Sequence, residues 1–221
     1  HQRAWLAYLA AFVIPVVVAG VALAVALLAG VVTLNPAAMD WGLVAVAIGT
    51  TFAGSAVKNI FEEFAWRGYL TPKLEALRVA APLAWLITGV IWASWHIPYY
   101  LYFLDPQALA EHTSLTPVAL ILLALLLLPL QASAYAEIRL WSGSVWPTWL
   151  MHGIANSLSL PLVASGFTSS ATGLGIIFAP GTEGVLYSLL MGAIGLALWR
   201  VRTGVKSNDE RRLTKAESAV Q

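Results

Sequence analysis

Two adjacent carboxylates and a guanidinium stand at the end of a long apolar run, within FEEFAWRGYL at residues 61–70. A charged side chain in or beside a bilayer costs at least a few kcal/mol, so Glu62, Glu63 and Arg67 need a reason to be there. Glu63 and Arg67 are four residues apart and can pair on one face of a helix. Glu62 is rotated by about 100° from Glu63 in a helix of 3.6 residues per turn. The spacing therefore predicts that one carboxylate holds Arg67 while the other points into a helical bundle.

Three more polar residues lie inside apolar runs. His96 is in IWASWHIPYY, and His152 and Asn156 are in WPTWLMHGIANS, four residues apart and so on one helical face. Each has an ordinary structural explanation, because histidines hydrogen-bond in helix packing and asparagines join neighbouring helices. A Glu–Arg pair at a membrane boundary can also be a snorkelling ion pair. The joint pattern favours a site, since polar groups within spans face the bundle interior and the three helices can converge there.

These residue types indicate hydrolysis by activated water. A glutamate with histidines can act as a general base, and a nearby amide can donate to an oxyanion. Other hydrolase sites are disfavoured: there is no HExxH motif, no glycine-flanked GxSxG serine in a span, and no cysteine. Aspartate occurs only as Asp40, Asp105 and Asp209, all outside the predicted spans, which excludes a paired-aspartate intramembrane protease.

The elements that must position these residues are membrane helices. The chain has 221 residues, of which 59% are apolar and 10% charged, against about 25% charged in a soluble domain. Crossing a bilayer takes roughly 20 residues. Apolar runs of about that length occupy residues 5–34, 41–61, 83–104, 116–136, 146–165 and 185–199. We therefore predict an all-α, polytopic bundle of about six transmembrane helices at residues 1–205, followed by a charged cytoplasmic tail at 206–221.

The distribution of basic residues predicts the orientation. With six spans, all twelve Lys and Arg residues fall on one side, including Lys58, Arg67 and the tail. The loops on the other side, around Asp40, residues 105–111 and Glu183, carry none. The positive-inside rule then places both termini in the cytoplasm of a multi-pass protein of the cell membrane. The net charge of +1, with no basic cluster outside the tail, gives no indication of nucleic-acid binding.

The polar residues form three motifs that resemble those of a known family. EEFAWR matches EExxxR, as Glu62, Glu63 and Arg67, and HGIAN matches HxxxN, as His152 and Asn156. WASWH is similar to FxxxH, with Trp92 in place of Phe and His96 conforming. In order and spacing, the first, second and third motifs resemble the CPBP family, which comprises CAAX proteases and bacteriocin-processing enzymes and is also called the Abi family of intramembrane proteases. The resemblance covers a core of about residues 40–165.

The resemblance implies a membrane peptidase whose site lies inside the bundle. Glu62 would be the general base that deprotonates water, with His96 helping to hold it. His152 and Asn156 would stabilise the tetrahedral oxyanion, and Glu63 would pair with Arg67. The implied substrate is a membrane-associated peptide or protein, possibly lipidated, such as a CAAX protein, a bacteriocin leader or a peptide pheromone.

Metal dependence and activity each have an alternative. No cofactor is favoured, but Glu62, His96 and His152 also make a chemically reasonable zinc set, since three ligands plus water form a catalytic zinc site. A non-proteolytic membrane binding or scaffold protein, or a bacteriocin self-immunity protein, stays open as an alternative function. The presence of all six motif residues favours proteolysis. A proton-coupled transporter is disfavoured because no internal repeat or pair of broken helices is seen.

Overall fold

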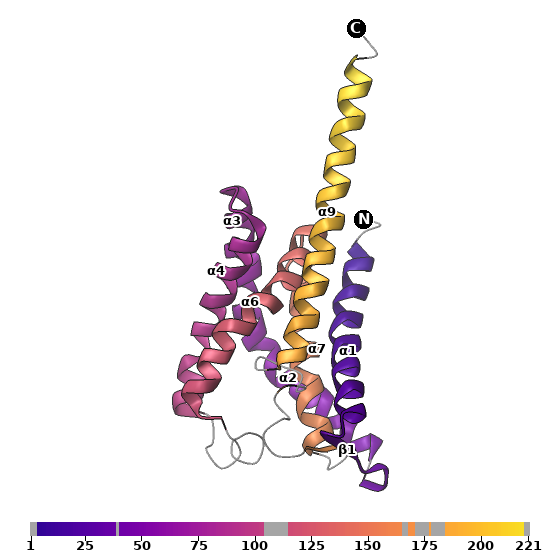
Figure 1. Cartoon of the computed structure of the whole chain (residues 1–221), viewed down its shortest axis with the longest axis vertical. Helices are drawn as coiled ribbons and strands as arrows, with labels where there is room; N and C mark the ends of the chain where they lie inside the picture. The colour runs from indigo at the N-terminus through magenta and orange to yellow at the C-terminus, as the bar shows by residue number, and fades with distance from the viewer. Residues whose placement is uncertain are drawn as a thin grey trace.

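The computed structural model describes residues 4–38, 40–103, 115–164, 168–170, 177 and 184–218. It is a helical bundle, so the predicted all-α class is confirmed (Figure 1). The α-helices are α1 (Ala4–Leu28), α2 (Trp41–Glu63), α3 (Thr71–Ala76), α4 (Ala81–Trp95), α6 (Pro117–Ser142), α7 (Trp146–Ala164) and α9 (Val185–Ser218). Short segments complete the described chain: a 3-10 turn η1 (Pro36–Ala38), two π-helical segments η2 (Phe64–Leu70) and η3 (Tyr99–Phe103), and an antiparallel pair of strands β1 (Val32–Leu34) and β2 (Thr168–Ser170).

Each predicted span coincides with a helix, but several boundaries differ. The first predicted span, 5–34, is too long: α1 ends at Leu28, and Gly30 turns the chain toward β1 with a left-handed φ of 68°. The second, 41–61, is too short, because the helical stretch continues through η2 to the end of α3. Among the described residues, four stretches are long and apolar enough to cross a membrane: Trp5–Leu28, Trp41–Ala76, Pro117–Ser142 and Val185–Gly204. The helices α4 and α7, at the other two predicted spans, are not among them.

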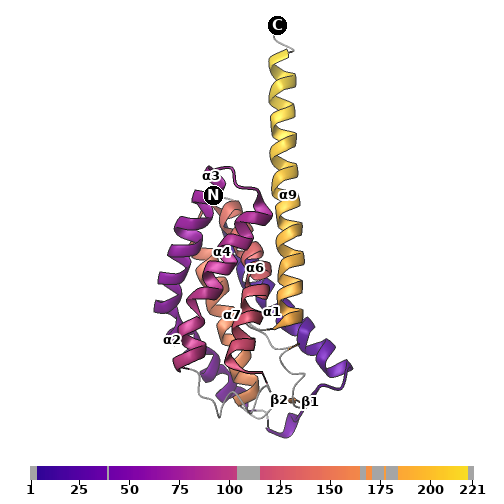
Figure 2. The same cartoon turned by 60° about the vertical axis from the view of Figure 1, so that its left-hand side comes forward.

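Helix α6 is central to the packing. It lies against α4 on one side and α9 on the other, while α7 packs against α2 and α1 (Figures 1 and 2). Glycines permit the closest approaches. A Cβ on Gly89 of α4 would overlap the backbone of Pro129, and a Cβ on Gly195 of α9 would overlap Ser133. Small residues at such crossings let helix backbones meet, which is how membrane helices gain van der Waals contact.

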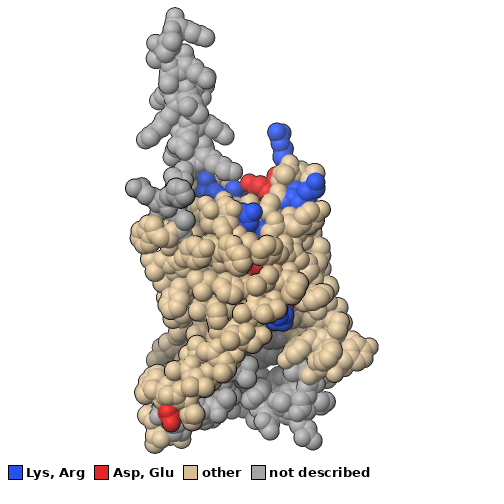
Figure 3. Space-filling view, turned by 180° about the vertical axis from the view of Figure 1, so that it is seen from behind, with Lys and Arg blue, Asp and Glu red and all other residues tan. Residues whose placement is uncertain are grey.

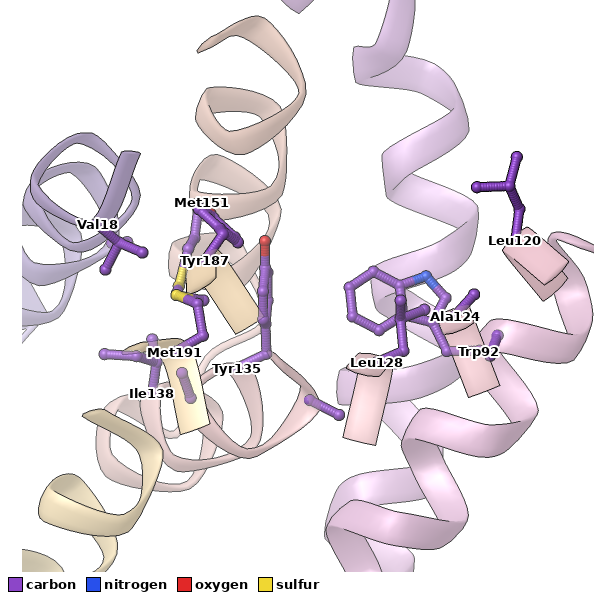
Figure 4. Packing of buried hydrophobic residues seen from close by; sticks show 14 of the residues in the cluster. Val18, Trp92, Leu120, Ala124, Leu128, Tyr135, Ile138, Met151, Tyr187 and Met191 are labelled. Carbon is purple, nitrogen blue, oxygen red and sulfur yellow. The ribbon is translucent and has the colours of Figure 1, made fainter. Parts of the chain in front are cut away.

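One hydrophobic cluster joins these helices. Figure 4 shows Trp92 of α4 beside Tyr135 of α6, with Met151 of α7 and Tyr187 and Met191 of α9 beyond the tyrosine. The Trp92 and Tyr135 rings meet edge to face, with centroids 5.5 Å apart. Since edge-to-face contact is a favourable geometry for aromatic rings, this pair fixes how α4 sits on α6. The pair also lies next to the charged residues of the first motif.

The two ends of the bundle differ in charge. The start of α1, α3 and the long C-terminal part of α9 lie at one end (Figures 1 and 2). Most of the Lys and Arg side chains visible in Figure 3 gather at that end, above a broad band that is largely uncharged but carries one basic side chain. Several basic residues lie within the span-capable helices and not in loops, among them Lys58, Arg67 and Lys73 in the stretch Trp41–Ala76. The loop residues 105–111 and Glu183 lie outside the described residues, and the cytoplasmic placement of the termini stays a prediction.

Candidate active site

The end of α2 buries both glutamates of the first motif. Glu62 is 2% exposed, and Glu63 and Arg67 are fully buried. Directly after Glu63 the helix widens into the π-helical segment η2, where the N–H of Thr71 reaches back five residues to the carbonyl of Trp66. Single π turns in helices occur frequently at functional sites. Here the wider turn carries Arg67.

Glu63 holds two partners with one oxygen. Arg67 Nη1 donates to Glu63 Oε1 at 2.8 Å, as the spacing of the first motif predicts. His152 Nδ1 lies 2.9 Å from the same oxygen. Because an ionised carboxylate only accepts hydrogen bonds, Nδ1 is the protonated nitrogen and donates to Glu63. That leaves His152 Nε2 as the ring atom available to a water or a substrate.

Aromatic rings cover the buried arginine. The guanidinium carbon of Arg67 lies 4.1 Å from the ring centroid of Trp92 and 4.4 Å from that of Tyr135. Nε and Nη2 of Arg67 have no hydrogen-bond partner within the described part of the chain, so these ring faces are their main neighbours. A desolvated cation over an aromatic face is stabilised by roughly 2 kcal/mol, which helps to offset the burial of the charge.

Glu62 points to different neighbours from Glu63. Its Oε1 lies 3.0 Å from Nζ of Lys58, a residue one turn earlier that is 53% exposed. Its Oε2 accepts a hydrogen bond of 2.9 Å from the indole Nε1 of Trp92. The predicted separation of the two carboxylates is therefore seen: Glu63 faces Arg67, and Glu62 faces α4. Each carboxylate oxygen can accept a further hydrogen bond, so these contacts leave room for a water.

His96 sits where α4 breaks. The helix α4 ends at Trp95, His96 lies in a turn, and the helix resumes at residues 97–98 and continues as η3. A proline has no N–H and its ring clashes with the carbonyl four residues earlier in a regular helix, so Pro98 accounts for the break. His96 Nδ1 lies 2.9 Å from the carbonyl oxygen of Trp92. A carbonyl only accepts, so Nδ1 carries the proton and the neutral ring presents Nε2 as an acceptor. The hydrogen bond to Glu62 from α4 comes from the Trp92 indole, and the role that the resemblance implies for His96 stays a prediction.

Asn156 is joined to a residue that the motifs do not include. Its Nδ2 donates to Oδ1 of Asn59 at 3.2 Å, and Asn59 Nδ2 donates in turn to Ser55 Oγ at 3.4 Å. Asn59 is fully buried on α2, three residues before Glu62. This chain of amides orients the second N–H of Asn156 and ties α7 to α2.

Four residues around the site were not found from the sequence, or were given a lesser role. Asn59 and Lys58 both lie within the second predicted span, 41–61, so the same search for polar groups in spans would have found both. Trp92 was expected only as an aromatic wall. Tyr135 could not be found from the sequence, because nothing near it in the chain indicates that its ring faces Arg67 and His152. The ring centroids of Tyr135 and His152 are 6.0 Å apart.

A separate group of charges lies between α3, α6 and α9. The buried Glu137 receives two hydrogen bonds from Arg202, at 2.6 and 3.2 Å, and Arg202 also donates to Glu75 at 3.1 Å. The group contains none of the motif residues and links three helices. It therefore stabilises the packing of α3, α6 and α9 against one another.

The zinc alternative requires three ligands around one point. Among the described residues, no group of three or more His, Cys, Asp or Glu side chains is arranged to hold a metal ion. In this conformation Glu62, His96 and His152 do not fit a zinc site.

Comparison with known families gives one match. The family model described as type II CAAX prenyl endopeptidase Rce1-like matches residues 41–158, just over half of the chain, and this range contains all three motifs. No curated protein matches the chain, and neither does any solved structure. The resemblance to the CPBP and CAAX protease family is thereby confirmed.

Proposed function

The chain belongs to the type II CAAX prenyl endopeptidase Rce1-like family, and from that premise we propose that it is an intramembrane endopeptidase. Its substrates in this proposal are membrane-associated peptides or protein termini, some of them lipidated. The family supports a membrane protease acting on membrane-associated proteins. The residues that act and the order of the steps are our proposal.

Convergence of the three motifs in the bundle interior supports the proposal most strongly. Three helices bring Glu62, His96 and His152 around Trp92, whose ring or backbone contacts residues of all three motifs. Charged groups in a membrane interior are expensive, and this cluster goes beyond what joining the helices requires. A site that activates water accounts for the exact residue types better than helix packing does.

In the proposed reaction, Glu62 takes a proton from a water whose oxygen attacks the carbonyl carbon of the scissile peptide bond. His96 Nε2 accepts a second hydrogen bond from that water. The negative charge that develops on the carbonyl oxygen accepts hydrogen bonds from the free N–H of Asn156 and from Nε2 of His152 in its imidazolium form. Glu62 then returns the proton to the leaving nitrogen as the C–N bond breaks, which yields a carboxylic acid and an amine.

A comparison of membrane-protein termini tests the proposal and identifies substrates together. Cells carrying the wild-type chain are compared with cells carrying Glu62→Gln by mass spectrometry of protein and peptide C-termini. We expect a set of termini that is shortened only with the wild type. Identical termini in the two strains would favour the alternatives, a non-proteolytic scaffold or a self-immunity protein.

The oxyanion role of Asn156 predicts a large loss of turnover. Removing one such donor typically lowers the rate by about 100- to 1000-fold. Asn156→Ala is therefore expected to lower kcat by that order with little change in KM, measured on a quenched peptide built from an identified terminus. The adjacent Ser157→Ala is the matched control, because within the described residues the Ser157 hydroxyl donates to the carbonyl of Gly153 in its own helix. Equal kcat in the two variants would remove Asn156 from the reaction.

Metal independence gives a further expected result. We propose that no metal takes part, so protein purified without zinc should keep its turnover in excess chelator. His152→Ala should then behave as a more severe form of Asn156→Ala, with no bound metal lost. Stoichiometric zinc in active protein, with chelator inactivation that zinc reverses, would instead make Glu62, His96 and His152 the ligands.

A further inference from the structure

Trp92 contacts residues of all three motifs. It is 4% exposed and lies on α4, one turn before His96. Its indole N–H donates to Glu62, its carbonyl accepts from His96, its ring face covers Arg67, and its ring meets His152 edge to face at 5.4 Å between centroids.

The indole N–H distinguishes the two oxygens of Glu62. Oε1 faces Lys58, a long side chain that is half exposed, whereas Oε2 faces the rigid and buried indole at 2.9 Å. A hydrogen bond to a charged group contributes more to stability than an ion pair with an exposed side chain. The tryptophan therefore sets the orientation of the carboxylate, and Lys58 is the partner that can move.

The ring face of Trp92 acts on the other carboxylate. It covers the Arg67 guanidinium, which in turn donates to Glu63, and Glu63 accepts from His152. One side chain thus ties the position of Glu62 to the Arg67–Glu63–His152 group. A phenylalanine, which is usual at this place in the second motif, would supply the ring without the N–H.

We propose that Trp92 is the positioning residue for Glu62, through an indole N–H···carboxylate contact that a phenylalanine at this position does not make. The proposal rests on the proposed function for the role of Glu62 as the base. The contact itself does not depend on that role, so the two can be tested apart.

The contact has a consequence for pH. Lys58 on α2 is ion-paired with Glu62, the titratable rings of His152 on α7 and His96 after α4 contact the same Trp92, and the Glu63–Arg67 pair is next along the helix. A donor aimed at the carboxylate stabilises its charged form. Without the N–H, Glu62 is protonated more easily, so activity is lost at a higher pH as the solution is acidified.

Trp92→Phe, with Trp95→Phe as the matched control, tests the proposal. Trp95 is on the same helix but is 58% exposed and packs against Trp66. We expect Trp92→Phe to move the acidic limb of the kcat profile upward by about one pH unit and to lower kcat at neutral pH by about tenfold, with KM little changed. Trp95→Phe should follow the wild type. A Trp92→Phe profile identical to that of Trp95→Phe, in folded protein, would overturn the proposal.

A measurement without substrate separates this proposal from the proposed function. In protein labelled with ¹⁵N-tryptophan, the indole N–H signal of Trp92 is identified by its loss in Trp92→Phe. Glu62→Gln should move this signal upfield, because a neutral acceptor replaces a charged one, and Glu75→Gln should leave it in place. If the signal moves but the protein cleaves no peptide, the contact between Trp92 and Glu62 is supported and the proposed peptidase function is contradicted. An unmoved signal would overturn the positioning role, whatever the activity of Trp92→Phe.

Discussion

Glu62→Gln is expected to lower turnover by roughly 10²- to 10⁴-fold, the usual contribution of a general base. Glutamine keeps the shape of the side chain and still accepts from the Trp92 indole, but it does not take a proton from water. Folding should change little, because Lys58 is half exposed and retains water as a partner. The measurement is kcat on an identified peptide, with the thermal midpoint of the same preparation.

Glu137→Gln is the control for loss of a buried carboxylate. Glu137 is 1% exposed on α6 and pairs with Arg202, away from the three motifs. We expect this variant to lose stability but to keep its kcat in the folded fraction. If Glu62→Gln retains full turnover while a folded Glu63→Gln has none, the two glutamates have the opposite roles from those proposed.

Relations within one helix could be predicted from the sequence. The spacing of four residues between Glu63 and Arg67 gave their ion pair, which has an N–O distance of 2.8 Å. The rotation of about 100° between Glu62 and Glu63 predicted that the two side chains would contact different neighbours. Both inferences depend only on helical geometry. They hold even though η2 widens the helix at Arg67.

Relations between helices could not be predicted in the same way. The hydrogen bond from Trp92 to Glu62 joins residues 30 positions apart, and that from Asn156 to Asn59 joins residues 97 apart. These contacts depend on where α4 and α7 cross α2, and the crossings depend on glycine contacts such as that of Gly89 with Pro129. The apolar pattern also placed the end of the first span too late, because the residues of β1 are apolar like those of α1. The end of the helix is marked by Gly30, which has a left-handed φ.

The cluster combines two tasks that conflict in a membrane. Catalysis by Glu62 needs a charged, partly hydrated carboxylate, whereas helix packing needs neutral and dry surfaces. The structure places the permanently charged Arg67 deep, against rings and Glu63, and gives Glu62 the half-exposed Lys58. Under the proposed function, Glu63 is the structural carboxylate of this pair and Glu62 the reactive one.

Glu63→Gln is therefore expected to act mainly on stability. Arg67 is fully buried, and Glu63 is its hydrogen-bonded anion, so a neutral amide leaves an uncompensated charge between Trp92 and Tyr135. Removing one partner of a buried ion pair costs about 3–5 kcal/mol. The measurement is the free energy of unfolding in a lipid or detergent environment. Turnover of the folded fraction should fall only in part, because glutamine still accepts from His152 Nδ1.

Two further variants test whether loss of the Glu63–Arg67 ion pair causes the loss of stability in Glu63→Gln. In Glu75→Gln, the lost carboxylate is 39% exposed and its partner Arg202 keeps Glu137, so the change should be at most about 1 kcal/mol. The double variant Glu63→Gln with Arg67→Met removes both charges and should recover part of the stability lost in Glu63→Gln alone. If the double variant is no more stable than the single one, the charge of Arg67 is not what Glu63 compensates, and the contact of Glu63 with His152 carries the stability instead.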